Sequence, residues 1–287
     1  MPQYKSLEDY LQSHPLDVDG LLDDGWGERF SVKGRIVDAT ILFADMGAFS
    51  SRSSTLCPIE TLILVQNFFA WISAEGLRQN GKIKGIVDKY IGDEAMVVFS
   101  KDFGSEDPLA DAIDAARWML ENDILGFYPH FGISSGQVVV GYVGTPLKYN
   151  CSVYGNAVTL AQRCCQVDDS DGRIVFPADI WGARKLEDVL TKRKMTPPDG
   201  HAFELDVPWK LLPPRKVLIK GDTQLEVLVI ASTDKSLRWH NRTAEQRAKQ
   251  GFEGLKKDGS FYPRRYASEA IPQGMIINPL ANKKRAD

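Results

Sequence analysis

The segment Ile36–Ala44 (IVDATILFA) constrains the fold of this chain more than any other stretch. It is mostly apolar and rich in strand-favouring residues, which is typical of a strand in the middle of a sheet. A helix is predicted after it, because Pro58 can open a helix and apolar residues then recur at helical spacing, at Leu62, Val65, Phe69 and Ile72. Asn80-Gly81 ends that helix. A buried strand followed by such a helix indicates a domain with mixed α and β structure.

The stretch that follows alternates between hairpins and helices. We expect, in chain order, a hairpin of Gly85–Tyr90 and Ala95–Phe99, a helix opened by Ser105 and Pro108, a hairpin of Phe131–Ser135 and Val138–Val143 around Gly136, a helix over Asn156–Cys165, and late strands at Val217–Lys220 and Glu226–Ala231. The resulting order β-α-ββ-α-ββ-α is that of an α+β domain with a ferredoxin-like core, in which helices pack on a sheet.

The chain divides into three predicted regions. Residues 1–34 form an N-terminal arm, residues 35–232 form the folded domain, and residues 233–287 form a basic tail. The tail holds twelve Lys or Arg and six Asp or Glu, so it carries about +6 and the rest of the chain about −9 within a net charge of −3. It contains aromatic residues but no recognisable nucleic-acid-binding module. We therefore expect an arm or a dimer extension, and no nucleic-acid partner.

The location of the protein is also an expectation from the sequence. No segment reaches the roughly 20 apolar residues that span a bilayer, and the N-terminus has no charged region followed by an apolar stretch. The four cysteines, Cys57, Cys151, Cys164 and Cys165, show no CxxC spacing and have no nearby histidines, which favours free thiols in a reducing compartment. We expect a cytoplasmic protein that does not bind a membrane.

Two carboxylates are the most informative polar residues. Asp45 ends the first strand, and Asp93 lies in the turn of the first hairpin. If the strand lies beside the hairpin, both carboxylates meet at one sheet edge, where they suit a hard divalent cation bound to phosphates. Phe43 lies two residues before Asp45, on the same strand face. Gly47 follows in a turn that lets backbone N–H groups approach an anion.

Four segments in this order resemble the catalytic domain of class III adenylate and guanylate cyclases: ILFADMGAFS, DKYIGDEAMVVF, FGISSGQVVVGYVG and VYGNAVTLAQR. The resemblance covers roughly Arg35 to Ser232. It implies a homodimer with shared active sites and two divalent metal ions, Mn²⁺ or Mg²⁺, held by Asp45, Asp93 and the backbone carbonyl of Met46. In such a site the ribose 3′-oxygen attacks the α-phosphorus and pyrophosphate leaves.

The resemblance also implies roles for the remaining site residues. Arg163 stands at the family's transition-state arginine, where a fixed cation stabilises charge on the α-phosphate. Thr159 lies one helical turn before it, at a position where the family has Asn. Nucleotide binding is assigned to residues around the first carboxylate and on later strands: Phe43, Gly47, Ala48, Phe49, Lys89, Ser152 and Lys220.

The positions that read the base depart from the family pattern. Adenylate cyclases usually use a Lys, which is present as Lys89, and an Asp, which is Ser152 here. Guanylate cyclases tend to carry Glu in place of Lys89. Lys89 offers only donors, which suit uracil O4, and Ser152 can meet uracil N3–H. We therefore expect UTP to be the best substrate, giving cyclic UMP, with CTP second and purines poor.

A cyclase with such an altered pocket resembles the bacterial uridylate and cytidylate cyclases of anti-phage defence, whose product activates a separate effector protein. Three alternatives stay open. The chain is an adenylate cyclase with an unusual pocket, a catalytically silent nucleotide-binding or dimerisation module, or a diguanylate cyclase, since Ile91–Glu94 (IGDE) is similar to the GGDEF loop. The helix that carries Arg163 argues against the last of these.

Overall fold

The computed structural model describes residues 4–23, 29–54, 56–73, 77–79, 82–121, 127–145, 147–167, 173–179, 192–195, 203–206, 209–219 and 223–232. The predicted basic tail and the predicted nucleotide contact Lys220 lie outside the described residues.

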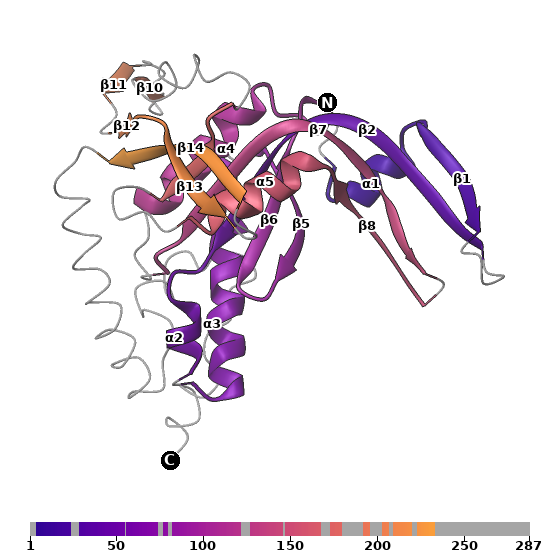
Figure 1. Cartoon of the computed structure of the whole chain (residues 1–287), viewed down its shortest axis with the longest axis horizontal. Helices are drawn as coiled ribbons and strands as arrows, with labels where there is room; N and C mark the ends of the chain where they lie inside the picture. Colours follow the sequence, from indigo (N-terminus) through magenta and orange to yellow (C-terminus); the bar gives the residue numbers. More distant parts are fainter. Residues whose placement is uncertain are drawn as a thin grey trace.

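A ten-stranded sheet forms the centre of the described structure (Figure 1). Its main path runs in the order β12-β14-β9-β7-β2-β6-β5, and the bounds of these strands are Trp209–Leu211, Thr223–Ser232, Ile174–Pro177, His130–Thr145, Arg29–Asp45, Glu94–Phe99 and Ile86–Ile91. Three strands pair beside this path: β1 (Val18–Asp23) with β2, β8 (Lys148–Tyr154) with β7, and β13 (Arg215–Ile219) with β14. Only the β7–β9 pair of this sheet is parallel.

Two short pairs lie apart from it, β3 (Arg78–Gln79) with β4 (Lys82–Ile83) and β10 (Lys192–Met195) with β11 (Phe203–Asp206).

Helices cover both faces of the sheet, which explains why β2 is apolar along its length. Alternate side chains of a strand point to opposite faces. Leu42 and Ala44 pack in the core under α3 (Pro58–Trp71) and α4 (Pro108–Glu121). Ile41 and Phe43 pack in a second core with α1 (Leu7–Gln12) and α5 (Asn156–Cys165). Two short helical segments complete the described elements, α2 (Phe49–Ser53) and the 3₁₀ turn η2 (Lys101–Phe103).

These elements confirm the predicted α+β class with helices on a sheet. The predicted helix over Asn156–Cys165 has the predicted bounds, and the hairpin of β5 and β6 is present. Helix α5 lies very close to β7, so that a Cβ atom on Gly132 would collide with the Ala161 carbonyl oxygen. Only glycine permits this approach, and it brings α5 down beside the end of β2.

The predicted hairpin around Gly136 is wrong. Residues 130–145 form one continuous strand, β7, and Gly136 pairs with Ala39 of β2 inside it. A glycine favours a turn only where the backbone lacks a partner, and the long strand β2 supplies one along all of this stretch. The turn comes later, and β8 then returns along β7.

The N-terminal region is more structured than an arm. Strand β2 begins at Arg29, so the predicted boundary between residues 34 and 35 falls inside it. Leu7, Tyr10 and Leu11 of α1 are buried in the second core. Figure 1 shows β1 and β2 extending together with β7 and β8 away from the rest of the sheet. No helix among the described residues is long and apolar enough to cross a bilayer.

Candidate active site

Asp45 and Asp93 meet at one end of the sheet, as the sequence predicts. Asp45 is the last residue of β2, and it stands opposite Glu94 in the β2–β6 pairing. The turn between β5 and β6 carries Asp93, whose carbonyl oxygen accepts a hydrogen bond from the Met46 N–H at 3.4 Å. This backbone contact joins the two segments, so the carboxyl groups of Asp45 and Asp93 lie within hydrogen-bonding reach of each other.

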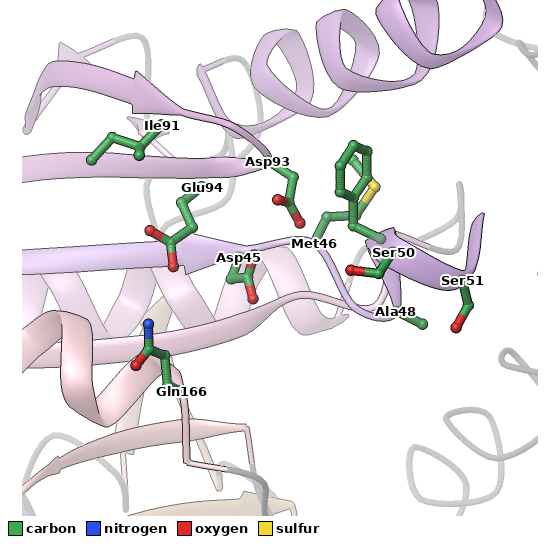
Figure 2. A pocket seen from close by; sticks show the side chains of 10 residues that line it. Asp45, Met46, Ala48, Ser50, Ser51, Ile91, Asp93, Glu94 and Gln166 are labelled. Atoms are coloured by element: carbon green, nitrogen blue, oxygen red, sulfur yellow. The ribbon is translucent and has the colours of Figure 1, made fainter. Parts of the chain in front are cut away.

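The carboxyl groups open into a cavity of about 350 Å³ (Figure 2). The described residues that line it come from the end of β2, the α2 segment, the β5–β6 turn and the end of α5: Asp45, Met46, Ala48, Phe49, Ser50, Ser51, Ile91, Asp93, Glu94 and Gln166. Three of these side chains are acidic, and none of the described lining residues is Lys, Arg or His. The described lining of the cavity therefore gathers acidic groups without a basic side chain among them.

The electrostatics of this cavity act mainly on Asp45. Burial, followed by the charge and hydrogen bond of Asp93 and the charge of Glu94, raises the pKa of Asp45 from 3.8 to about 8. Burial also raises the pKa of Glu94, which a hydrogen bond from Gln162 of α5 partly offsets. Two neighbouring carboxyl groups that resist joint ionisation favour either a shared proton or a bound cation.

The donor set fits a hard divalent cation. Carboxylate oxygens are the ligands that Mg²⁺ and Mn²⁺ prefer, and such ions commonly complete their coordination with water and substrate phosphates. The described residues contain no cluster of three or more Cys, His, Asp or Glu side chains placed to hold a metal ion. The Met46 carbonyl, which the family resemblance assigns as a ligand, would add one backbone oxygen to the two carboxylates.

The residues around Asp45 differ in whether they line the cavity. Ala48 and Phe49 line the cavity, whereas Phe43 is buried in the core and does not. The Gly47 N–H donates a hydrogen bond to the Phe127 carbonyl oxygen at 3.1 Å, so it is already engaged within the chain. A side chain at Gly47 would also collide with the Tyr128 carbonyl oxygen. Phe43 therefore packs in the core and the Gly47 N–H bonds within the chain, and the nucleotide contacts assigned to these two residues stay predictions.

Four other predicted site residues that the structure describes lie outside this cavity. Thr159 is exposed on α5, and Arg163, one turn later, is partly buried. Both are absent from the cavity lining, as are Lys89 and Ser152. Lys89 and Ser152 instead both contact the carboxylate of Asp88. The Ser152 hydroxyl donates to Asp88 Oδ2 at 2.6 Å, and Lys89 Nζ lies 3.4 Å from the same oxygen.

Sequence reasoning missed Asp88, Glu94 and Gln166. Asp88 precedes Lys89 in the motif DKYIGDE, but strict strand alternation would put these neighbours on opposite faces. Glu94 follows Asp93 directly, and its place opposite Asp45 depends on the pairing of β2 with β6. Gln166 reaches the cavity only because α5 packs close to the sheet.

Comparison with known proteins agrees with this geometry. Residues 32–176 match the adenylate and guanylate cyclase catalytic domain. An adenylate cyclase of Anabaena cylindrica is 31% identical over 136 residues, which cover 43% of this chain and 26% of that protein. An uncharacterised protein of Mycobacterium tuberculosis is 27% identical over 160 residues, which cover 54% of this chain and 29% of that protein. The chain thus spans less than a third of the length of these relatives.

A solved structure shares the fold. The adenylyl cyclase CyaB of P. aeruginosa superimposes with a TM-score of 0.52 at 17% identity, and the match covers 70% of this chain and 97% of that one. At this identity the similarity concerns the architecture of the sheet and its helices.

Proposed function

We propose that this chain, which belongs to the adenylate and guanylate cyclase catalytic domain family and carries a nucleotidyl cyclase catalytic domain, converts a pyrimidine nucleoside triphosphate, with UTP favoured, to its 3′,5′-cyclic monophosphate and pyrophosphate. The observation that carries the proposal is the pair Asp45 and Asp93 in a cavity whose described lining has no basic side chain. Such a cavity suits a substrate that arrives with divalent cations.

The chemistry needs an in-line displacement. The bond between the ribose 3′-oxygen and the α-phosphorus forms, the bond from that phosphorus to pyrophosphate breaks, and the hydroxyl proton is released. Asp45, Asp93 and the Met46 carbonyl would hold two divalent metal ions, Mn²⁺ or Mg²⁺, which supply activation of the hydroxyl and neutralisation of phosphate charge. Ala48 and Phe49 would border the triphosphate.

A second copy of the chain would complete the site. Arg163 and Thr159 lie outside the cavity of their own chain. In a head-to-tail homodimer, Arg163 of the second copy would face the α-phosphate, where a guanidinium stabilises developing negative charge. Thr159 of that copy would contribute one hydroxyl. Lys220, outside the described residues, keeps its predicted contact with the triphosphate.

The preference for uracil rests on the group around Lys89. The Asp88 side chain is 1% exposed and Ser152 is buried, and the two are hydrogen-bonded to each other, so neither side chain presents an exposed acceptor to a base. Lys89 is partly exposed and offers donors only. A base that presents carbonyl oxygens satisfies Lys89, whereas an amino group leaves a donor unmatched, at a cost of about 1–3 kcal/mol. Uracil has two carbonyl oxygens and no amino group, so its N3–H is the one donor on its base-pairing edge that this group leaves without an acceptor.

The wider role is part of the same proposal. A cyclase with a changed base pocket resembles the bacterial pyrimidine cyclases of anti-phage defence. In that setting the cyclic nucleotide acts as a second messenger in the cytoplasm and activates a separate effector protein. The named adenylate cyclase relative favours one second candidate, an adenylate cyclase with an altered pocket.

The test is a substrate panel. The purified chain is incubated with ATP, GTP, CTP and UTP at equal concentration with Mn²⁺ or Mg²⁺, and cyclic products are identified by mass. We expect cyclic UMP as the main product. Cyclic AMP as the main product would support the adenylate alternative. Binding of nucleotide without any cyclic product would support a silent module. Asp45→Asn serves as the inactive control.

A further inference from the structure

Strand β5 contains a β-bulge at Asp88. Val87 pairs with Val97 and Lys89 pairs with Met96, so Asp88 is an extra residue without a partner on β6. A bulge of this kind re-aims side chains and is common beside active sites. It lets two consecutive residues reach the same neighbouring strand. Asp88 contacts Ser152 of β8, and Lys89 Nζ lies 5.8 Å from the ring centre of Tyr154, also on β8.

The bulge also places the following residue. Tyr90 stacks on Phe69 of α3, with ring centres 4.0 Å apart. This contact anchors the strand immediately after Lys89. The chain is therefore held on both sides of the lysine, by Asp88 against β8 and by Tyr90 against α3.

Asp88 is a buried carboxylate with a complete set of partners. Its side chain is 1% exposed, whereas that of Lys89 is 38% exposed. It accepts hydrogen bonds from the Ser152 hydroxyl and from the Val153 backbone N–H, and it pairs with the Lys89 ammonium. Burial raises the pKa of Asp88, and these three donors act in the opposite direction. A carboxylate in this environment fixes its partners in place, because leaving any of them unpaired is costly.

Ser152 points its only proton at Asp88 and is itself 2% exposed. Its hydroxyl therefore holds the Asp88 carboxylate in place, and almost none of the Ser152 side chain is accessible to a base. This differs from the sequence expectation that Ser152 reads the base directly. Of the three residues, only Lys89 has substantial exposed surface.

We propose that Asp88 is a specificity-determining positioning residue: braced by Ser152 and the Val153 N–H, it holds the Lys89 ammonium in one place, and Lys89 alone of this group reads the nucleotide base. This inference rests on the proposed nucleotidyl cyclase function. Adenylate cyclases of the family usually have an Asp at the position of Ser152. Here the carboxylate is Asp88 of strand β5, and it acts through Lys89 rather than on the base.

The test compares three variants, Lys89→Ala, Asp88→Asn and Ser152→Ala, and the double variant Lys89→Ala/Asp88→Asn. The Asn side chain keeps the shape and an acceptor for Ser152 but cannot form the ion pair. For the triphosphate that the unmodified chain uses best, we expect Asp88→Asn to raise KM roughly tenfold to a hundredfold with little change in kcat, and to reduce the preference among bases. Ser152→Ala should have a smaller effect, because the ion pair stays.

The double variant separates positioning from a merely structural role. If Asp88 acts through Lys89, adding Asp88→Asn to Lys89→Ala changes KM no further, which is a non-additive result. Additive effects, or an unchanged KM in Asp88→Asn, would overturn the proposal. So would a larger loss of base preference in Ser152→Ala than in Asp88→Asn, because that result assigns base reading to Ser152.

Matched controls keep the outcome interpretable. Asp19→Asn breaks an exposed pair with Lys33, 3.8 Å apart, and should leave KM unchanged. Urea denaturation checks that each variant folds. Competition with a fluorescent nucleoside triphosphate analogue measures binding in parallel, so a chain without turnover still tests the role of Asp88. A substrate order led by ATP would contradict the proposed uracil preference and leave the Asp88 comparison intact.

Discussion

Two carboxylate groups in this protein are built in opposite ways. At the end of β2, Asp45 lies against Asp93 and Glu94, and no basic side chain is among the described cavity lining. On β5, Asp88 has a lysine, a hydroxyl and a backbone N–H as partners. Both are substantially buried, but among the described residues at the two places only the second has a basic side chain beside it. The first group favours a shared proton or a cation from outside, and the second lies against a lysine of the protein.

This difference separates two functions that sit on adjacent strands. The unbalanced group is suited to bind metal ions and phosphates, because their charge removes the repulsion between its carboxylates. The balanced group is suited to recognition, because its donors are already oriented before a ligand arrives. The predictions below test whether each group depends on the property assigned to it.

The largest effect is expected from neutralising the unbalanced group. Asp45→Asn or Asp93→Asn should lower kcat by at least about a hundredfold, because charge stabilisation at the reacting phosphate is lost. Product formation with Mn²⁺ measures the effect. The exposed Glu106 provides the control, since Glu106→Gln should turn over like the unmodified chain. Near-normal turnover of either Asp variant would show that this residue is not a required metal ligand.

A mixture of two inactive variants tests whether Arg163 serves the cavity of another copy. After subunit exchange, half of the dimers pair an Asp45→Asn chain with an Arg163→Ala chain, and each of these has one intact shared site. Activity should therefore return to about a quarter of the unmodified level. Verified exchange without recovery would place the complete site within one chain.

A second carboxylate beside Asp88 should destabilise the fold. Ser152→Asp puts two carboxyl groups where Ser152 Oγ and Asp88 Oδ2 now lie 2.6 Å apart. The free energy of unfolding should fall by about 1–3 kcal/mol, because one buried charge loses its donor. Urea denaturation measures the change. The double variant Asp88→Ser/Ser152→Asp moves the carboxylate to β8 and should recover most of the loss, whereas equal stability of Ser152→Asp and the unmodified chain would contradict the assignment.

The last prediction concerns pH. The pKa of Asp45 rises from 3.8 to about 8 on folding, so the folded state holds this proton more tightly than the unfolded state. Without divalent cations, the contribution of Asp45 to the free energy of unfolding should be present at low pH and decline as pH rises from 3.8 to about 8. Mg²⁺ should stabilise the protein increasingly over the same range, because it competes with the proton. Denaturation at several pH values measures both trends, and Asp45→Asn should reduce both; a metal effect independent of pH would argue against ligation by Asp45.

Local patterns were sufficient for much of the fold. The apolar run at Ile36–Ala44 identified the central strand, and the helix over Asn156–Cys165 was confirmed at both ends. The motifs predicted that Asp45 and Asp93 meet, because both stand where strands end. Strand β8 was missed because its residues lack a strong strand pattern, and pairing with the long strand β7 determines its structure.

The sequence by itself determined two carboxylates of the cavity, Asp45 and Asp93, and the family to which the chain belongs, since residue identity at strand ends and in ordered motifs is enough for both. Only the tertiary structure decided how the base-reading side is arranged. A one-residue bulge in β5 reverses the faces of the residues that follow it, and nothing in the spacing of Asp88, Lys89 and Ser152 reveals it. Strand register and burial are properties of the packed sheet, so the pairing of Ser152 with Asp88 became visible only there.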